Sequence, residues 1–295
     1  MPSSTHKLNL CILLAAGVSI NLLSASAQSE ERMPITAQQI IERIKAKVGI
    51  EWSSNTVDTF KAGDPATQVT GVTTTMFPTL DVLKKSVAAG NNLIVCHEPT
   101  FYNHLDNLSP LEKDEVQQAK LRYVKEHGLV IFRFHDHWHR MRPDGIVMGM
   151  VEALGWQNRS RKGEQTVFDL APTNVGELAK EMKEKLKAAA VRVVGDPQLA
   201  CSKIALSVGA AGSLTQIAML QRDDIDVLVC GETREWETVE YARDAITAGK
   251  HKALIVLGHA PSEEAGMNYC ARWLSGFLTE VPVKFIPCGD PFWAP

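Results

Sequence analysis

A stretch of 19 residues recurs in this chain at a constant offset of 134 positions, and this repeat constrains the fold more than any other feature. Residues 80–98, LDVLKKSVAAGNNLIVCHE, align without a gap with residues 214–232, LTQIAMLQRDDIDVLVCGE. In both copies a helical pattern leads into an apolar strand that ends in Cys-x-Glu. Because the apolar strand positions and the final Glu coincide, the match predicts a duplicated strand–helix–strand unit.

Strand and helix patterns alternate along most of the chain. Apolar runs such as LIVC, LVIFRFHDH and LIVL are separated by segments with helical periodicity, for example LDVLKKSVA. The alternation predicts an α/β protein with two related halves, residues 28–156 and 201–295, which pack together and flank a middle segment at 157–200. Ligands of such folds bind where strands reach their carboxyl ends, so we expect a functional site there, between the halves.

The first 27 residues have the features of an export signal. The apolar run LNLCILLAAGVSINLL is followed by SASAQ, and the small residues at 25–27 predict cleavage before Gln28. Because the run is short and interrupted by small and polar residues, an uncleaved membrane anchor is disfavoured. We therefore expect an exported protein, periplasmic or secreted, with no membrane segment after cleavage.

Composition excludes some classes of partner and site. The chain is 45% hydrophobic with a formal net charge of −3, and without an excess of Lys and Arg we expect no nucleic-acid partner. The five cysteines beyond the signal are scattered, which argues against a disulfide framework or a CxxC zinc site. Cys96 and Cys230 close apolar strands, where free cysteine usually acts as a small buried hydrophobic residue.

Side chains that bind metals gather at three expected strand ends. They are His97 and Glu98 after LIVC, then His135, Asp136, His137 and His139 in FRFHDHWHR, and His259 and Glu263 in LIVLGHAPSEE. Imidazoles and carboxylates together suit Zn, Mn, Fe or Ni better than Ca or Mg. A carboxylate such as Glu263 can bridge two cations, so we expect two divalent ions.

Each cluster also has a purely structural explanation. The His-Glu pair could be an ion pair, and HDHWH could be a His-rich surface tract, in which strand geometry would place His135, His137 and His139 on one face. His259 could cap a helix, with Glu263 as a first-turn carboxylate; their i, i+4 spacing is only partly helical if the helix starts at Pro261. A metal site explains all three clusters at once.

No other catalytic signature competes with the metal site. The chain has no G-x-S-x-G, no GxxxxGK[ST] and no HExxH motif. The glycine-rich turn GAAGS at 209–213 could cradle an anion, or it could simply permit a tight turn.

Four segments carry a resemblance to a known family. They are VTGVTTTMFPTLDVLKKSVAAGNNLIVCHEPTFY, VRVVGDPQLACSKIALSVGAAGS, DVLVCGETREWETVEYA and LGHAPSEEAGM. Over roughly residues 35–295 the chain resembles the Nif-three-like dinuclear metal-centre proteins, often named GTP cyclohydrolase type 2-like. The resemblance implies a two-domain α/β fold and a homohexameric ring with metal sites facing an internal cavity. The export signal departs from the family, whose members are commonly cytosolic.

The resemblance also implies a ligand set. Family ligands fall on His97, Glu98, His259 and Glu263, where Glu98 replaces the family's usual second histidine. His135 matches the histidine of an H-T-x-x-D motif, and His139 stands in place of its aspartate. This gives His139 as a ligand, with His135 or Asp136 as a substitute ligand or as a group that orients one.

These residues lead to two functional hypotheses. The first is a metal-dependent hydrolase for a small-molecule or nucleotide substrate, in which the metals lower the pKa of water. Glu232, which aligns with Glu98 in the repeat, is then the candidate general base or a carboxylate that orients a ligand. The alternative is a protein without catalysis that uses the metals as a scaffold, or that stores or delivers them.

Overall fold

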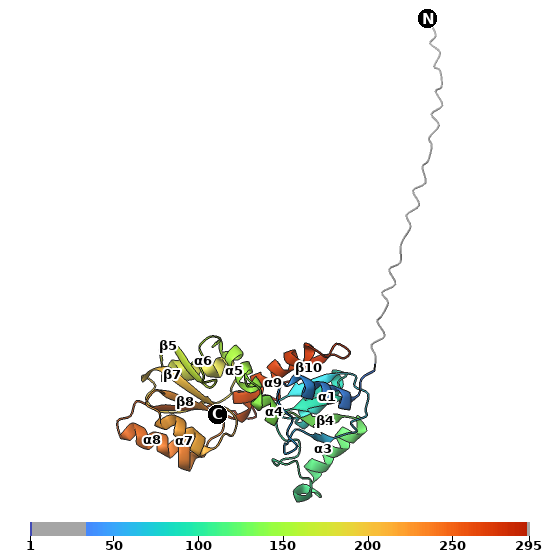
Figure 1. Cartoon of the computed structure of the whole chain (residues 1–295), viewed down its shortest axis with the longest axis horizontal. Coiled ribbons are helices and arrows are strands. Elements are labelled where there is room, and N and C mark those ends of the chain that lie inside the picture. The colour runs from blue at the N-terminus through green and yellow to red at the C-terminus, as the bar shows by residue number, and fades with distance from the viewer. Residues whose placement is uncertain (2–33, 294–295) are drawn as a thin grey trace. The chain divides into compact units, whose positions relative to one another are not determined.

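The computed structural model describes residue 1 and residues 34–293 (Figure 1). Met33–Pro295 form one compact unit. The predicted export signal, apart from Met1, lies outside the described residues. Among the described helices, none is long and apolar enough to cross a membrane.

The first sheet has five strands in the order β1-β4-β3-β2-β10. The three central strands are parallel and buried throughout, as expected for a sheet that is covered on both faces. β10 continues the parallel set beside β2, and β1 runs antiparallel to β4 at the other edge. The strands are β1 (Phe60–Ala62), β2 (Val72–Thr75), β3 (Leu93–Cys96), β4 (Val130–Arg133) and β10 (Val283–Phe285).

Helices cover both faces of this sheet. One face packs against α1 and α9 through a cluster that includes Ile40, Val95 and Leu274. The other face packs against α2 and α3 through Leu83, Ile94 and others. The helices are α1 (Ala37–Lys47), α2 (Leu80–Ala88), α3 (Glu115–Glu126) and α9 (His259–Ser275), with a short 3-10 turn η1 (Ser109–Leu111) before α3.

The second sheet has the order β5-β7-β8-β9-β6, again with a parallel centre, and with an antiparallel strand at each edge. α5 and α6 cover one face, and α7 and α8 cover the other. The strands are β5 (Val167–Asn174), β6 (Arg192–Val194), β7 (Ala200–Ser207), β8 (Val227–Cys230) and β9 (Ala253–Val256). The helices are α5 (Gly145–Leu154), α6 (Val175–Lys185), α7 (Ser213–Gln221) and α8 (Glu240–Thr247), the last preceded by a π-helical turn η2 (Glu235–Val239).

The predicted fold class is confirmed, because the two halves repeat one unit. β3 and β8 begin and end 134 residues apart, and α2 and α7 lie at nearly the same offset. Each strand is the central strand of its five-stranded sheet. The free cysteines Cys96 and Cys230 are buried at the two equivalent strand ends.

The two sheets do not follow the predicted chain boundaries. β5 and β6, from the expected middle segment, form the edges of the second sheet, and β10 joins the first sheet although it lies within the predicted second half, residues 201–295. The 17-residue helix α9 brings the chain back to the first sheet, where β10 pairs with β2.

Helices α5 and α9 pack against each other between the two sheets (Figure 1). Glycines permit the close approach: a Cβ on Gly149 would lie 2.5 Å from the Cα of Gly266, and a Cβ on Gly266 would lie 2.5 Å from the Cα of Ile146. α9 begins directly after β9, so this packing fixes where the end of β9 lies relative to the end of β4.

Candidate metal centre

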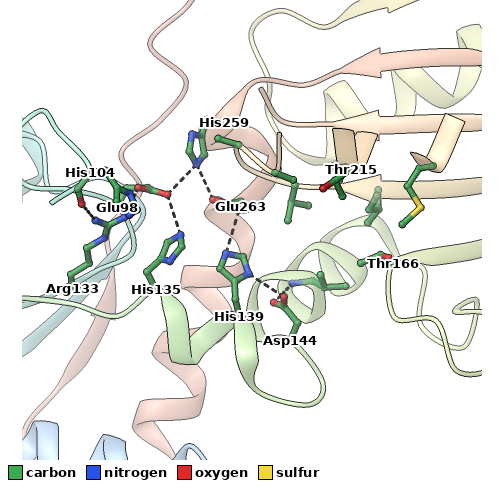
Figure 2. Close-up of a pocket in the computed structure, with 17 residues that line it drawn as sticks. Glu98, His104, Arg133, His135, His139, Asp144, Thr166, Thr215, His259 and Glu263 are labelled. Atoms are coloured by element: carbon green, nitrogen blue, oxygen red, sulfur yellow. Dashed lines mark hydrogen bonds and ion pairs between the residues drawn. The ribbon is translucent and has the colours of Figure 1, made fainter. Parts of the chain in front are cut away.

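Six side chains from three strand ends converge at one point. Figure 2 shows all of them except His97. His97 and Glu98 follow β3, and His259 and Glu263 lie on the first turns of α9. After β4, His135 is the N-cap of the short helix α4 (Asp136–Arg140) and His139 lies on that helix. His97, Glu98 and Glu263 are at most 7% exposed, and the other three are partly exposed. Two overlapping sets of donor atoms lie within 4.8 Å of one another: His97, His135 and His139, and His97, Glu98 and Glu263.

All four histidines direct Nε2 toward this point. The Nε2 atoms of His97 and His139 are 3.1 Å apart. His259 Nε2 lies 3.1 Å from Glu263 Oε2 and 3.2 Å from Glu98 Oε1. His135 Nε2 is 3.6 Å from Glu98 Oε1.

The Nδ1 atom of each histidine faces an acceptor outside the cluster. His97 donates to the Phe134 carbonyl oxygen at 3.2 Å. The other three face carboxylates: His135 with Asp136 at 2.9 Å, His139 with Asp144 at 3.0 Å, and His259 with Glu232 at 2.8 Å. Such bonds fix the tautomer with Nε2 unprotonated and free to bind a metal.

This arrangement fits a metal ion. With each Nδ1 carrying a hydrogen, the neutral rings of His97 and His139 would face each other with two lone pairs at 3.1 Å. A cation between them, either a proton or a metal, removes that repulsion. Nitrogen and carboxylate donors in this mixture are the ligands that divalent transition metals prefer.

Protonation in the absence of metal supports the same conclusion. Burial disfavours charge on His259, but its hydrogen bonds to Glu263 and Glu98 outweigh burial and raise its pKa to about 11. Burial instead lowers the pKa of His97 well below its usual value. The carboxylates of Glu98 and Glu263 therefore favour a positive charge at this point, and a proton on His259 supplies it when no metal does.

Arg133 explains why a glutamate can stand at position 98. Its side chain is fully buried and donates to Glu98 Oε2 at 3.0 Å and to the carbonyl oxygens of His97 and His104. One Glu98 oxygen is thus held by a permanent charge while the other, Oε1, faces His259 and His135. The guanidinium suits such a fixed, forked contact.

The strand predicted through LVIFRFHDH is wrong beyond Arg133. The chain leaves β4 there and forms the one-turn helix α4, so His135 and His139 are four residues apart on helical backbone and do not alternate along a strand. The buried carboxylate of Asp58 causes this turn: it accepts the N–H groups of His135, Asp136 and His137 at 2.7, 2.9 and 2.8 Å.

His137 does not face the cluster. Its Nδ1 donates to Asp58 at 2.7 Å, its Nε2 accepts the Ser53 N–H at 2.9 Å, and its ring stacks on Trp52 at 3.7 Å. Asp136 also turns away, since its Oδ2 accepts from Thr56 and Val57, while its Oδ1 orients His135.

The other predicted residues lie in or beside the cluster. His259 is the first residue of α9, so the i, i+4 spacing to Glu263 is fully helical. Pro261 lies in the first turn, where backbone N–H groups have no acceptor within the helix, so the missing N–H of proline costs no hydrogen bond. Glu232 contacts the cluster only through His259 Nδ1, and its side chain is 58% exposed. This contact is that of a carboxylate that orients a ligand.

Sequence reasoning missed Asp58, Arg133 and Asp144. Arg133 left a signal, since an arginine inside the apolar run LVIFRF must find a partner when buried. Asp144 also left one, because it precedes α5 as a capping residue; one oxygen accepts from Ile146 and Val147 and the other from His139. Asp58 left no signal, because its role appears only after loops 79 residues apart meet.

A cavity of about 450 Å³ opens directly onto the cluster. Glu98, His135, His139, His259 and Glu263 line one end, with Arg133, His104 and Asp144 beside them. The second half supplies the other end, through the last residues of β7 and the start of α7. The volume suits a small molecule.

The fold and the cluster together define a two-half α/β protein with a candidate metal centre at its strand ends. The chain belongs to the Duf34/NIF3 (NGG1p interacting factor 3) family, whose profile matches residues 35–291. The predicted family is therefore confirmed.

Relatives and solved structures agree with this assignment. A Chlamydia pneumoniae protein named GTP cyclohydrolase 1 type 2 homolog is 22% identical over 254 residues, which cover 79% of this chain and 89% of that protein. A Staphylococcus aureus protein (strain MRSA252) of the same name is 27% identical over 128 residues, 41% of this chain but only 34% of the relative's length. The chain thus matches about a third of that relative.

Crystal structures give the same fold at low identity. A Staphylococcus aureus hypothetical protein aligns with a TM-score of 0.71 at 17% identity, over 89% of this chain and 100% of that one. A Bacillus cereus protein related to NIF3 aligns with a TM-score of 0.69 at 14% identity, over 89% and 99%. These similarities establish the fold.

Proposed function

We propose that this protein binds two divalent metal ions and acts as a metal-dependent hydrolase on a small-molecule substrate. One observation carries the proposal: four imidazoles are held by outward hydrogen bonds on Nδ1 so that every Nε2 points at the same two carboxylates. Structural histidines seldom share one orientation in this way, whereas metal-binding histidines almost always have such a partner on the second nitrogen.

The position of Glu263 supports a site for two ions. Its Oε1 lies 3.6 Å from His139 Nε2, and its Oε2 lies 3.1 Å from His259 Nε2 and 3.6 Å from that of His97. Glu263 therefore stands between a group on one side, His97 and His139, and a group on the other, Glu98 and His259, with His135 beside Glu98. We infer that each group would hold one ion and that Glu263 would be available as a ligand to both.

The residues around the centre then have separate roles. Divalent ions held here would lower the pKa of water and stabilise negative charge on a substrate. Arg133 holds Glu98 in place, Asp144 and Asp136 hold the rings of His139 and His135, and Glu232 holds that of His259. We assign Glu232 this orienting role in preference to that of general base. Zn, Mn, Fe and Ni all suit the donor set.

Elemental analysis tests the centre. We expect about two metal equivalents per chain in the purified protein and in His127→Ala, a control that removes an exposed histidine from the end of α3, and clearly less in His259→Ala. Full occupancy in His259→Ala would refute the ligand assignment. A protein that holds no metal and takes up none of Zn, Mn, Fe or Ni would refute the centre itself.

Turnover tests the activity separately. The metal-loaded protein is assayed with phosphoesters, nucleotides and cyclic amides, with the chelated protein as the blank. Hydrolysis that requires the metal supports the proposal. A fully loaded protein that hydrolyses none of these classes would favour the alternative, a metal scaffold or a storage protein.

Export and assembly remain proposals from the sequence. We propose that the mature chain begins at Gln28 after export, which sequencing of the amino terminus of the natural protein tests. We also propose a homohexamer, by resemblance to the family, which light scattering of the purified mature chain tests.

A further inference from the structure

The cavity at the metal centre has a second end with different chemistry. It extends to the start of α7: Ala210 and Ala211 line it from the turn before the helix. Thr215 lines it from the first turn of α7, with Thr166 on the neighbouring wall (Figure 2). Leu206, Val208 and Met219 supply the apolar surface between the two ends. A molecule bound at the metals would therefore place its far end beside the start of α7.

The start of α7 is suited to an anion. Its N-cap is Gly212, and no side chain caps the first turn, so the N–H groups of that turn have no side-chain acceptor. These groups and the helix dipole together attract negative charge. In the other copy of the repeat, the Thr79 side chain caps α2 by accepting the Val82 N–H, so α2 offers no such position.

A second, independent observation concerns Ser207 at the end of β7. Ser207 is one of the residues that line the same cavity, it is only 6% exposed, and its hydroxyl has no hydrogen-bond partner among the described residues. Buried hydroxyl groups are nearly always paired, because an unpaired one loses its bonds to water without replacement. An acceptor on a ligand would give the Ser207 hydroxyl a hydrogen-bond partner.

We propose that this end of the cavity binds a compact oxyanion of the substrate, either a carboxylate or a phosphate monoester. The first-turn N–H groups of α7 and the hydroxyls of Ser207 and Thr215 are its donors. The proposal rests on the proposed function for the reacting end, and it adds the substrate class: a small molecule with a hydrolysable bond at the metals and one anionic group at α7.

The same lining disfavours a polyphosphate such as that of GTP. Among the described residues that line the cavity, Arg133 is the only Lys or Arg, and it is already bound to Glu98 and to two carbonyl oxygens. Triphosphates are usually held by cationic side chains or Mg²⁺. If the ring of GTP reacted at the metals, its triphosphate would lie at an end with none.

Calorimetric titration of the metal-loaded full chain with inorganic phosphate, and separately with acetate, tests the proposal. Thr215→Glu places a carboxylate in the first turn of α7, where it competes for the N–H groups and repels an anion. We expect this variant to weaken binding of the preferred anion at least about tenfold, and Thr215→Val and Ser207→Ala to weaken it less. Thr279→Val, an exposed threonine in another loop, is the matched control.

The outcomes separate this proposal from the metal centre. Weaker binding in Thr215→Glu with unchanged metal content supports the site, and the anion that binds more tightly identifies its class. Equal affinity in the wild type, in Thr215→Glu and in Thr215→Val would overturn it, because the anion would then bind only at the metals. A protein that takes up none of Zn, Mn, Fe or Ni but still binds phosphate through Thr215 would instead overturn the proposed function and leave this site standing.

Discussion

Strands β3 and β8 occupy equivalent positions in the two halves, but the residues that follow them differ. After β3 come His97 and Glu98, both in the cluster; after β8 come Gly231 and Glu232. A Cβ on Gly231 would lie 2.5 Å from the Gly209 carbonyl oxygen. The first copy therefore uses this position for a ligand, and the second uses it for close packing against the turn after β7.

In the next strand of each half, both copies use the strand end for ligands, and the difference lies in what supports those ligands. β4 and β9 are each followed by two donors four residues apart, His135 and His139 after β4 and His259 and Glu263 after β9. Their supports differ: α9 has 17 residues and sustains its own first turns, whereas α4 has five and depends on the carboxylate of Asp58. Isolated short helices are unstable, so the first half needs an external cap that the second does not.

The largest expected effect comes from breaking that support. Asp58→Ala removes the acceptor of three backbone N–H groups and of His137 Nδ1; the two bonds to His137 are buried and the other two partly buried. We expect about 3 kcal/mol or more of lost unfolding free energy, and metal affinity lower by about 10–100-fold because His135 and His139 lose their positions. Denaturant unfolding and competitive chelation measure the two quantities.

Two further variants make the Asp58 test specific. Asp58→Asn keeps one oxygen for His135 and Asp136 and should fall between the wild type and Asp58→Ala. Asp81→Ala removes an exposed carboxylate on α2 and should change neither quantity. If Asp58→Ala bound metal as tightly as the wild type, the dependence of α4 on this carboxylate would be wrong.

A smaller effect is expected from a side chain at Gly231, the position after β8 that corresponds to His97 after β3. Gly231→Ala forces the Gly209 turn or the Ser262 side chain to move, because both lie against the new Cβ. We expect a loss of about 1–3 kcal/mol in unfolding free energy. Thermal and denaturant unfolding measure it; an unchanged stability would show that this position tolerates a side chain and that packing does not explain the glycine.

The smallest effect is expected at the partly exposed residue that follows Gly231. Glu232→Gln keeps an acceptor for His259 Nδ1 but removes the charge. We expect metal affinity to fall by about tenfold, the lower end of the range for residues that orient a ligand, since water screens this exposed carboxylate. Competitive chelation measures it. Loss of turnover with unchanged metal affinity would instead favour Glu232 as a general base.

Local pattern was enough to predict the repeat and where the donors would fall. His97, Glu98, His259 and Glu263 all follow buried apolar runs, and parallel strands bring their carboxyl ends to one edge. It was not enough to separate His139 from His137, since alternation along a strand and turns of a helix make different predictions for HDHWH. The choice depended on Asp58, which is distant in the sequence.

The two α/β units, their spacing along the chain and the types of donor at each strand end follow from local sequence, because neighbouring residues encode apolar periodicity and strand termination. Folding in three dimensions settles which donors meet, that Arg133 holds Glu98, and that α7 is left uncapped toward the cavity. Each of these depends on contacts between residues far apart in the chain, across the packing of α5 on α9, and no local pattern records such contacts.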